Sequence, residues 1–115
     1  MAFEEEARLP VELLIKAHLR RCFSEGVPAV VVHRGEKNSG IIILKLLQRG
    51  AGCRVLTQMR DLDGVMGWLP ALDGKAVPES EADAYIDRAV ARDPDLWVIE
   101  IEHPDGWHPF DGKEI

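Results

Sequence analysis

Two apolar runs on either side of a polar segment dominate the pattern of this chain. Residues 29–32 form the first run and residues 40–47 the second, and both are rich in the β-branched and leucine side chains of strands. Glycine and asparagine in the segment 35–39 favour a turn. The pattern predicts a β-hairpin in which Val31 lies opposite Ile43. Both faces of this hairpin would be mainly apolar, although one face of an antiparallel hairpin is usually solvated.

Before the hairpin, the chain predicts a helix from about Pro10 to Ser24. Apolar side chains recur there at the 3, 4, 7 and 8 residue spacing of one helix face. Pro10 suits the first turn, where its missing N–H has no partner, and Gly26 followed by Pro28 ends the helix. Three basic residues lie on the opposite side of this helix: Lys16, Arg20 and Arg21.

The second half of the chain predicts further strands and one more helix. Alternating apolar and polar positions predict a half-buried strand over residues 53–60, and the apolar segment 96–102 predicts a strong one. The apolar spacing of residues 80–92 predicts a helix that stops before Pro94. Two weaker candidate strands cover residues 65–69 and 107–110.

The order of these elements indicates an α+β fold: helix, three or four strands, helix, strand and an optional last strand. We expect a mixed, mainly antiparallel sheet of four to six strands with two helices packed on it. The only crossover long enough to make two strands parallel runs through the second helix. A length of 115 residues fits a single domain over residues 9–115, and residues 1–8 predict a flexible N-terminal tail.

Composition limits the classes of function. The net charge is −6 and the pI is about 5.1, which argues against general binding to nucleic acid or to anionic membranes. The first 50 residues are the less acidic part, because they carry eight basic and six acidic groups. The acidic start does not resemble a signal peptide, and Cys22 and Cys53 have the spacing of neither a zinc site nor a disulfide scaffold. We therefore expect a cytoplasmic protein.

Several segments together resemble a known family. They are residues 17–22, 26–32, 34–35, 40–45, 81–88 and, above all, 93–102. These segments are similar to an uncharacterised bacterial family, domain-of-unknown-function family 1491. The shared features are hydrophobic and turn patterns without a catalytic signature. The resemblance implies one compact domain and supplies no mechanism.

His33 is the candidate for acid–base chemistry. If the last strand lies beside the hairpin, Glu100 or Glu102 can approach His33, and a histidine–carboxylate pair is the minimum equipment for general acid–base catalysis. The same pair is also common as a surface contact of little consequence. His103 and His108 match no zinc or calcium spacing, so we expect neither a metal nor a cofactor.

Binding residues are sought among arginines and tryptophans near turns. An arginine beside an exposed tryptophan suits recognition of a protein or of a small anionic ligand. The candidates are Arg34, Arg60, Trp68 and Trp107. The alternative interpretation is that the tryptophans cover the end of the sheet while the arginines are solvated.

The second apolar sheet face is a further candidate. It carries Val31, Ile41 and Ile43, and it could be covered by helices divided between the faces, by a curled sheet or by a second chain. Charged residues on this face, such as Lys45 and Glu100, favour a self-complementary dimer or a docked partner protein.

Because polar residues gather in turns and on helix backs, the sequence favours a non-enzymatic protein-interaction or small-ligand-binding module. One alternative is a small hydrolase or isomerase that uses His33 with Glu100 or Glu102. The other is weak contact with nucleic acid through the basic side of the first helix.

Overall fold

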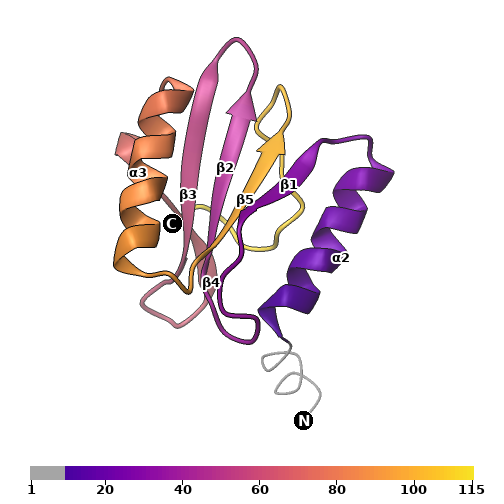
Figure 1. Cartoon of the computed structure of the whole chain (residues 1–115), viewed down its shortest axis with the longest axis vertical. Coiled ribbons are helices and arrows are strands. Elements are labelled where there is room, and N and C mark those ends of the chain that lie inside the picture. The colour runs from indigo at the N-terminus through magenta and orange to yellow at the C-terminus, as the bar shows by residue number, and fades with distance from the viewer. Residues whose placement is uncertain (1–9) are drawn as a thin grey trace.

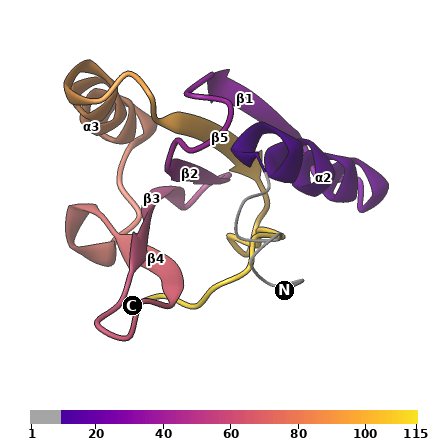
Figure 2. The ribbon, with the colours of Figure 1, turned by 90° about the horizontal axis from the view of Figure 1, so that it is seen from below.

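A computed structural model describes residues 10–115 as a five-stranded sheet with one helix on each face (Figures 1 and 2). The elements are α2 (Val11–Ser24), β1 (Ala29–His33), β2 (Ile42–Gln48), β3 (Gly52–Arg60), β4 (Met66–Pro70), a 3-10 turn (Leu72–Gly74), α3 (Glu79–Arg92) and β5 (Trp97–Glu102). The α+β class and both helices are confirmed, and residues 65–69 belong to a strand. The tail predicted over residues 1–8 lies outside the described residues.

The strand order is β1-β5-β2-β3-β4. Only β2 and β5 run parallel, and the other three pairs are antiparallel. The crossover that makes them parallel passes through α3, as predicted. The predicted β1–β2 hairpin is wrong, because β5 lies between its two arms. Val31 pairs with Ile99 and Ile43 pairs with Val98.

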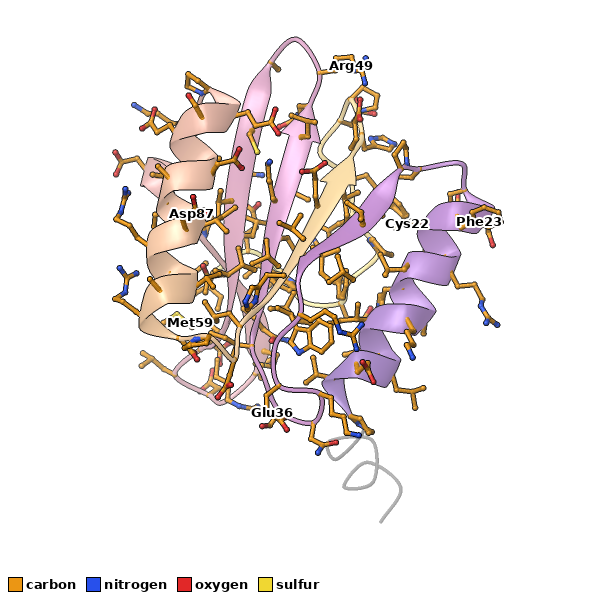
Figure 3. All side chains as sticks on the ribbon, viewed as in Figure 1. Cys22, Phe23, Glu36, Arg49, Met59 and Asp87 are labelled. Atoms are coloured by element: carbon orange, nitrogen blue, oxygen red, sulfur yellow. The ribbon has the colours of Figure 1, made fainter. Side chains whose placement is uncertain are left out.

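The segment between β1 and β2 holds the start of β5 in this position. Glu36 N–H donates to the Asp95 carbonyl at 3.0 Å, and the Trp97 backbone N–H donates to the Ile41 carbonyl at 2.9 Å. The Trp97 indole N–H also donates to the Glu36 carbonyl at 2.8 Å. A Cβ on Gly40 would lie 2.2 Å from the Asp95 oxygen, so only glycine permits this approach. The loop that suggested a hairpin, which carries Glu36 (labelled in Figure 3), therefore binds a third strand.

The two helices divide the core between the two sheet faces. The α2 face buries one side of β2, with Ile42, Leu44 and Leu46, and the α3 face buries Ile43. This alternation was predicted correctly within β2. Val31, however, packs with the α2 cluster and not with Ile43 as expected, because β1 pairs with β5 in a register of its own. In residues 10–115 no helix has the length and apolarity that crossing a membrane requires.

The C-terminal segment closes the far edge of the sheet. Residues 107–110 form no strand, contrary to one expectation, but Phe110 is buried in the α2 cluster. Farther on, the Trp68 backbone N–H donates to the Lys113 carbonyl, and Ile115 N–H donates to the Trp68 carbonyl, both at 2.9 Å. The outer edge of β4 is thus covered by the end of the chain itself.

One lysine is buried among the apolar residues of β2. The Lys45 ammonium lies 2.7 Å from both Glu79 and Asp83 of α3 and 3.0 Å from Glu100 of β5. Burial alone would lower the pKa of Lys45, but hydrogen bonds to the three carboxylates outweigh it and raise the pKa above its ordinary value. Because the pKa is higher in the folded state, this charge stabilises the fold at neutral pH, and that stabilisation is lost only as the pH rises above about 10.

We expect Lys45→Met to lower the free energy of unfolding at pH 7 by about 3 kcal/mol, because it leaves three carboxylates together without their cation. The value is at the low end for a broken buried ion pair, since Glu79 and Asp83 are half exposed. Urea denaturation at pH 7 measures the difference in the free energy of unfolding between the variant and the wild type. Lys75→Met, at an exposed lysine, is the matched control, and equal stability of the Lys45 variant and the wild type would contradict the role of the cluster.

We also expect Gly40→Ala to destabilise the fold by about 2 kcal/mol, the usual cost of overpacking. The added methyl group would overlap the Asp95 carbonyl and lie 2.9 Å from the Trp97 ring. Thermal unfolding should show a lower midpoint for this variant. Asn38→Ala, at an exposed position of the same loop, should change the midpoint little, and a similar loss in both variants would mean that the contact with β5 is not the cause.

Candidate functional site

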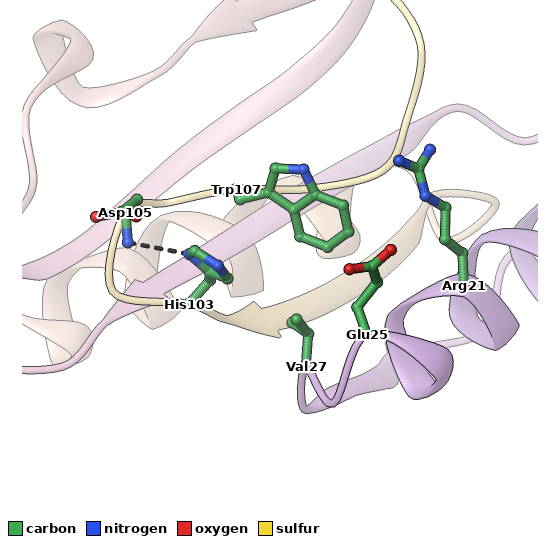
Figure 4. Close-up of a pocket in the computed structure, with 6 residues that line it drawn as sticks. All are labelled: Arg21, Glu25, Val27, His103, Asp105 and Trp107. Carbon is green, nitrogen blue, oxygen red and sulfur yellow. Dashed lines mark hydrogen bonds between the residues drawn. The ribbon is translucent and has the colours of Figure 1, made fainter.

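One hollow of the described residues lies where α2 ends and the chain leaves β5. A cavity of about 480 Å³ is lined there by Arg21, Glu25, Val27, His103, Asp105 and Trp107 (Figure 4). We refer to this group as the Trp107 cleft. A second cavity of about 480 Å³ adjoins it and shares Glu25, Val27 and His103 with it. Because they share these three residues, the two cavities join into one open groove.

Two turns position the walls of the cleft. Gly26 has a φ of +72° and follows α2; its N–H donates to the Phe23 carbonyl at 3.1 Å and Val27 N–H donates to Cys22 at 2.8 Å. This is the Schellman arrangement, in which a left-handed residue ends the helix and an apolar side chain turns back onto it. The antiparallel pairing of Ala29 with Ile101 then brings the residues before β1 beside the residues after β5.

Positively and negatively charged side chains lie beside the Trp107 ring in the cleft. The Arg21 guanidinium carbon lies 5.6 Å from the centre of the Trp107 ring, within the range of a cation–π contact. Figure 4 shows the side chains of Arg21 and Glu25 both directed from the end of α2 towards Trp107. Asp105 adds a second carboxylate on the opposite wall. The cleft therefore offers a cation, two anions and a flat apolar surface.

The orientation of His103 fixes what its ring can do. Its Nδ1 accepts a hydrogen bond from Asp105 N–H at 3.1 Å, so the neutral ring carries its proton on Nε2. The ring centre lies 5.8 Å from that of Trp107. In its neutral form, His103 can donate a hydrogen bond from Nε2 to a ligand, but it has no free nitrogen there to accept a proton.

The structure does not bring together the proposed acid–base pair. His33 Nδ1 donates to the Leu96 carbonyl at 2.8 Å. Glu100 contacts Lys45 at 3.0 Å, and Arg49 Nε donates to Glu102 at 2.7 Å. Both carboxylates are thus engaged by cations, and neither forms a hydrogen bond with His33.

The four arginine and tryptophan candidates lie in different surroundings. Arg34 is paired with Glu12, and its guanidinium lies 5.5 Å from the Trp97 ring centre. Arg60 donates to the Gly64 carbonyl at 2.8 Å and so ties its own turn. Trp68 is only 2% exposed, and its indole donates to the Asp111 carbonyl, so this ring is part of the core and offers no surface for binding. Of the four, only Trp107 lines the cleft.

The expected dimer face does not exist as one surface. Ile43 is 1% exposed and is covered by the α3 side of the core, whereas Val31 packs against the α2 side. Ile41 alone is exposed. The helices cover one sheet face each, which is one of the three solutions that the two-faced pattern left open.

The cysteines and carboxylates of the described residues offer little other chemistry. Burial raises the pKa of Cys22, and it raises the pKa of Cys53 to about 11. Both thiols are therefore protonated at neutral pH and poorly nucleophilic. No group of three or more potential metal-binding side chains gathers within residues 10–115.

Sequence patterns drew attention to most residues of the cleft, but they did not indicate that these residues lie together. Arg21 stood out as part of a basic stripe, and His103 and Asp105 as members of a polar turn. Glu25 and Val27 carried no signal of their own. The two glycines that turn the chain, Gly26 and Gly106 with φ values of +72° and +69°, were the available cue.

Comparison with known proteins places these features in a family. Residues 9–111 match the family model described as "Protein of unknown function (DUF1491)". A crystal structure of a DUF1491 family protein from Caulobacter crescentus CB15 is 30% identical, with a TM-score of 0.83 over 93% of this chain and 99% of that one.

Two solution structures are also similar. An NMR structure of a DUF1491 family protein from Caulobacter crescentus CB15 is 30% identical, with a TM-score of 0.80 over 93% of this chain and 96% of that one. The solution structure of a protein from A. tumefaciens is 27% identical, with a TM-score of 0.68 over 84% and 86% of the two chains. The search of curated proteins gave no match.

His108, beside the core of the α2 face, yields a pH-dependent prediction. Burial lowers the pKa of His108, so the unfolded chain takes up a proton below about pH 6.5 that the folded protein does not. Folding stability should therefore fall as the pH decreases from 7.5 to 5.5. His108→Asn keeps an acceptor for Phe110 N–H, which now donates to Nδ1 at 3.2 Å, but cannot titrate. Urea denaturation should show a smaller loss for the variant, and parallel pH profiles would exclude His108 as the cause.

Proposed function

The chain belongs to the DUF1491 family, and we propose that it is a non-enzymatic, cytoplasmic binding module whose ligand site is the Trp107 cleft. The ligand class that fits best is an extended molecule with a carboxylate, such as a polypeptide segment. The observation that carries this proposal is the Arg21 guanidinium held 5.6 Å from the Trp107 ring at the wall of an open cavity.

The chemistry of Arg21 supports a carboxylate as the recognised group. Arginine presents a planar fork of N–H donors that matches a carboxylate, and stacking on an aromatic ring fixes the plane of that fork. The Trp107 ring supplies apolar area next to the charge. Glu25 and Asp105 nearby would accept hydrogen bonds from amide or ammonium groups of the same ligand. A polypeptide segment carries all of these groups.

The shape of the groove supports an extended ligand. The adjoining cavity continues from Val27 past Pro28 to Pro104, so a ligand seated on Trp107 can continue along the start of β1. The state of the His103 ring favours a role in binding over a role as a catalytic base. Its Nδ1 accepts a hydrogen bond from Asp105 N–H, and its Nε2 already bears the proton.

The indole N–H resonances in ¹⁵N-labelled protein provide a local test. The indoles of Trp68 and Trp97 donate to backbone carbonyls in the interior, so the Trp107 signal reports on the cleft. We expect acetylated alanyl-leucine with a free carboxylate to shift the Trp107 signal alone. The C-terminal amide of the same peptide should bind to the wild type about tenfold more weakly than the free acid does. The free acid should bind to the Arg21→Gln variant about tenfold more weakly than to the wild type. In both cases one charge-assisted hydrogen bond, worth about 1.5 kcal/mol or more, is lost.

Arg20→Gln is the matched control, because Arg20 is exposed on the same helix but lines a different hollow with Leu13, Lys16 and Ala17. Its binding curve should equal that of the wild type. Equal binding of acid and amide, equal losses in the two arginine variants, or a motionless Trp107 signal at millimolar peptide would each refute the proposed site.

A further inference from the structure

The two edge strands of the sheet differ in whether other backbone groups bond to their outer sides. The edge strand β4 is covered by Lys113 and Ile115, whose backbone groups bond to Trp68. The opposite edge strand, β1, has β5 on one side, and no backbone group of residues 10–115 bonds to its outer side. Figure 2 shows α2 packed against the face of the sheet near β1. The helix therefore does not cover the outer edge of β1.

The backbone groups that face outward from β1 follow from the hydrogen-bond alternation. Glu102 N–H donates to the Pro28 carbonyl at 2.9 Å, so Pro28 faces β5. In an antiparallel pair the residues that face the partner alternate, and Val30 therefore also faces β5. The N–H and C=O groups of Ala29 and Val31 point away from the sheet. These four groups are a template for another strand.

We propose that β1 pairs antiparallel with β1 of a second copy of this chain, about a two-fold axis at Val31. A two-fold axis there sets Val31 opposite its own copy, and the two strands exchange the N–H and C=O bonds of that residue. Ala29 then lies opposite His33 of the partner subunit. The result is one continuous sheet through two molecules, independent of any ligand in the Trp107 cleft.

The exposed side chains of β1 match this arrangement. Val30 is 52% exposed and Val32 is 53% exposed, which is unusual for two valines of one edge strand. With the axis at Val31, each Val30 lies opposite the partner's Val32, so the symmetry covers all four side chains with apolar neighbours. The strand sequence Ala-Val-Val-Val-His contains neither the lysine nor the proline that commonly blocks an edge.

Charges at the two ends of the strand are complementary under the same symmetry. Arg34 follows β1, and its side chain is 68% exposed although it also contacts Glu12. The axis sets Arg34 opposite Pro28 of the partner subunit. Pro28 lies at the rim of a hollow that Glu100 and Glu102 also line. Each copy thus places an arginine near two carboxylates of the other, although Lys45 and Arg49 already contact these carboxylates within each chain. The self-complementary pairing of the valines is therefore the stronger reason to favour a second copy over an unrelated strand.

A bulge limits the strength of this contact. The pairing with β5 slips between Val31 and His33, so the regular ladder is short and the strand bends beyond it. We therefore expect reversible association that depends on concentration.

Sedimentation equilibrium over a concentration series tests the proposal. The weight-average mass of the wild type should rise from 12.9 kDa towards twice that value. Val30→Lys and Val32→Lys should each remain at the monomer mass, because each places a lysine against a partner valine. Val65→Lys is the matched control, since Val65 is 59% exposed and precedes the distant strand β4; it should associate like the wild type. A wild type that stays monomeric throughout, or variants that associate undiminished, would overturn the proposal.

Disulfide cross-linking tests the register separately. Native Cys22 and Cys53 are buried, so an introduced thiol on β1 is the accessible one. A mixture of Val30→Cys and Val32→Cys proteins should form cross-linked dimers under mild oxidation much faster than either protein alone, because the axis brings residue 30 opposite residue 32. Faster cross-linking within either protein alone would exclude the axis at Val31.

Discussion

The burial of β5 in the centre of the sheet is the constraint on which the rest of the structure depends. Its residues Val98, Ile99 and Ile101 are almost completely buried, on both sides of the strand. Each such side chain contributes about 1.5–3 kcal/mol when it leaves water. A central strand with two apolar faces requires a layer on each face, and α2 and α3 supply one layer each. The same constraint therefore determines both the order of the strands and the placement of one helix on each sheet face.

The position of β5 also creates the open edge of β1 and the Trp107 cleft. Because β1 is displaced outward by β5, β1 becomes an edge strand with exposed valines. Because β1 runs antiparallel to β5, the residues that enter β1 lie beside those that leave β5, and the cleft forms between Val27 and His103. Had β1 paired with β2, neither the cleft nor this edge would exist in its present form.

Much of the fold was predictable from local pattern. The helix face that contains Ile15 and Cys22 has a helical period, and both helices were predicted within one residue of their observed bounds. Strand partners were not predictable in the same way. The segment from Ile42 to Leu47 is apolar on both faces, so its pattern is satisfied equally by β1 or by β5 as a neighbour. The short polar loop with two glycines favoured β1, the strand nearer in sequence, as the neighbour of β2. The contact of this loop with Asp95 joins residues far apart in the sequence, and no local pattern indicates it.

The candidate site was less predictable than the fold. Its residues come from a helix end and a turn separated by almost eighty positions, and each segment alone resembles an ordinary solvated terminus. Trp68 and Trp107 looked alike in sequence, since both stand near predicted turns. Trp68 is buried because the C-terminal residues 111–115 fold over β4, whereas Trp107 is half-buried and lines the cleft. Such differences depend on distant chain segments.

Lys45 explains why the chain selects β5 as the neighbour of β2. In the observed register Lys45 lies opposite Glu100, and α3 adds Glu79 and Asp83. In the hairpin with Val31 opposite Ile43, Lys45 would lie opposite Ala29. That pairing would take the Glu100 carboxylate away from the buried ammonium group, and loss of a partner of a buried charge is destabilising. The hydrophobic pattern permits both topologies, and the carboxylate that β5 supplies to Lys45 favours the observed one.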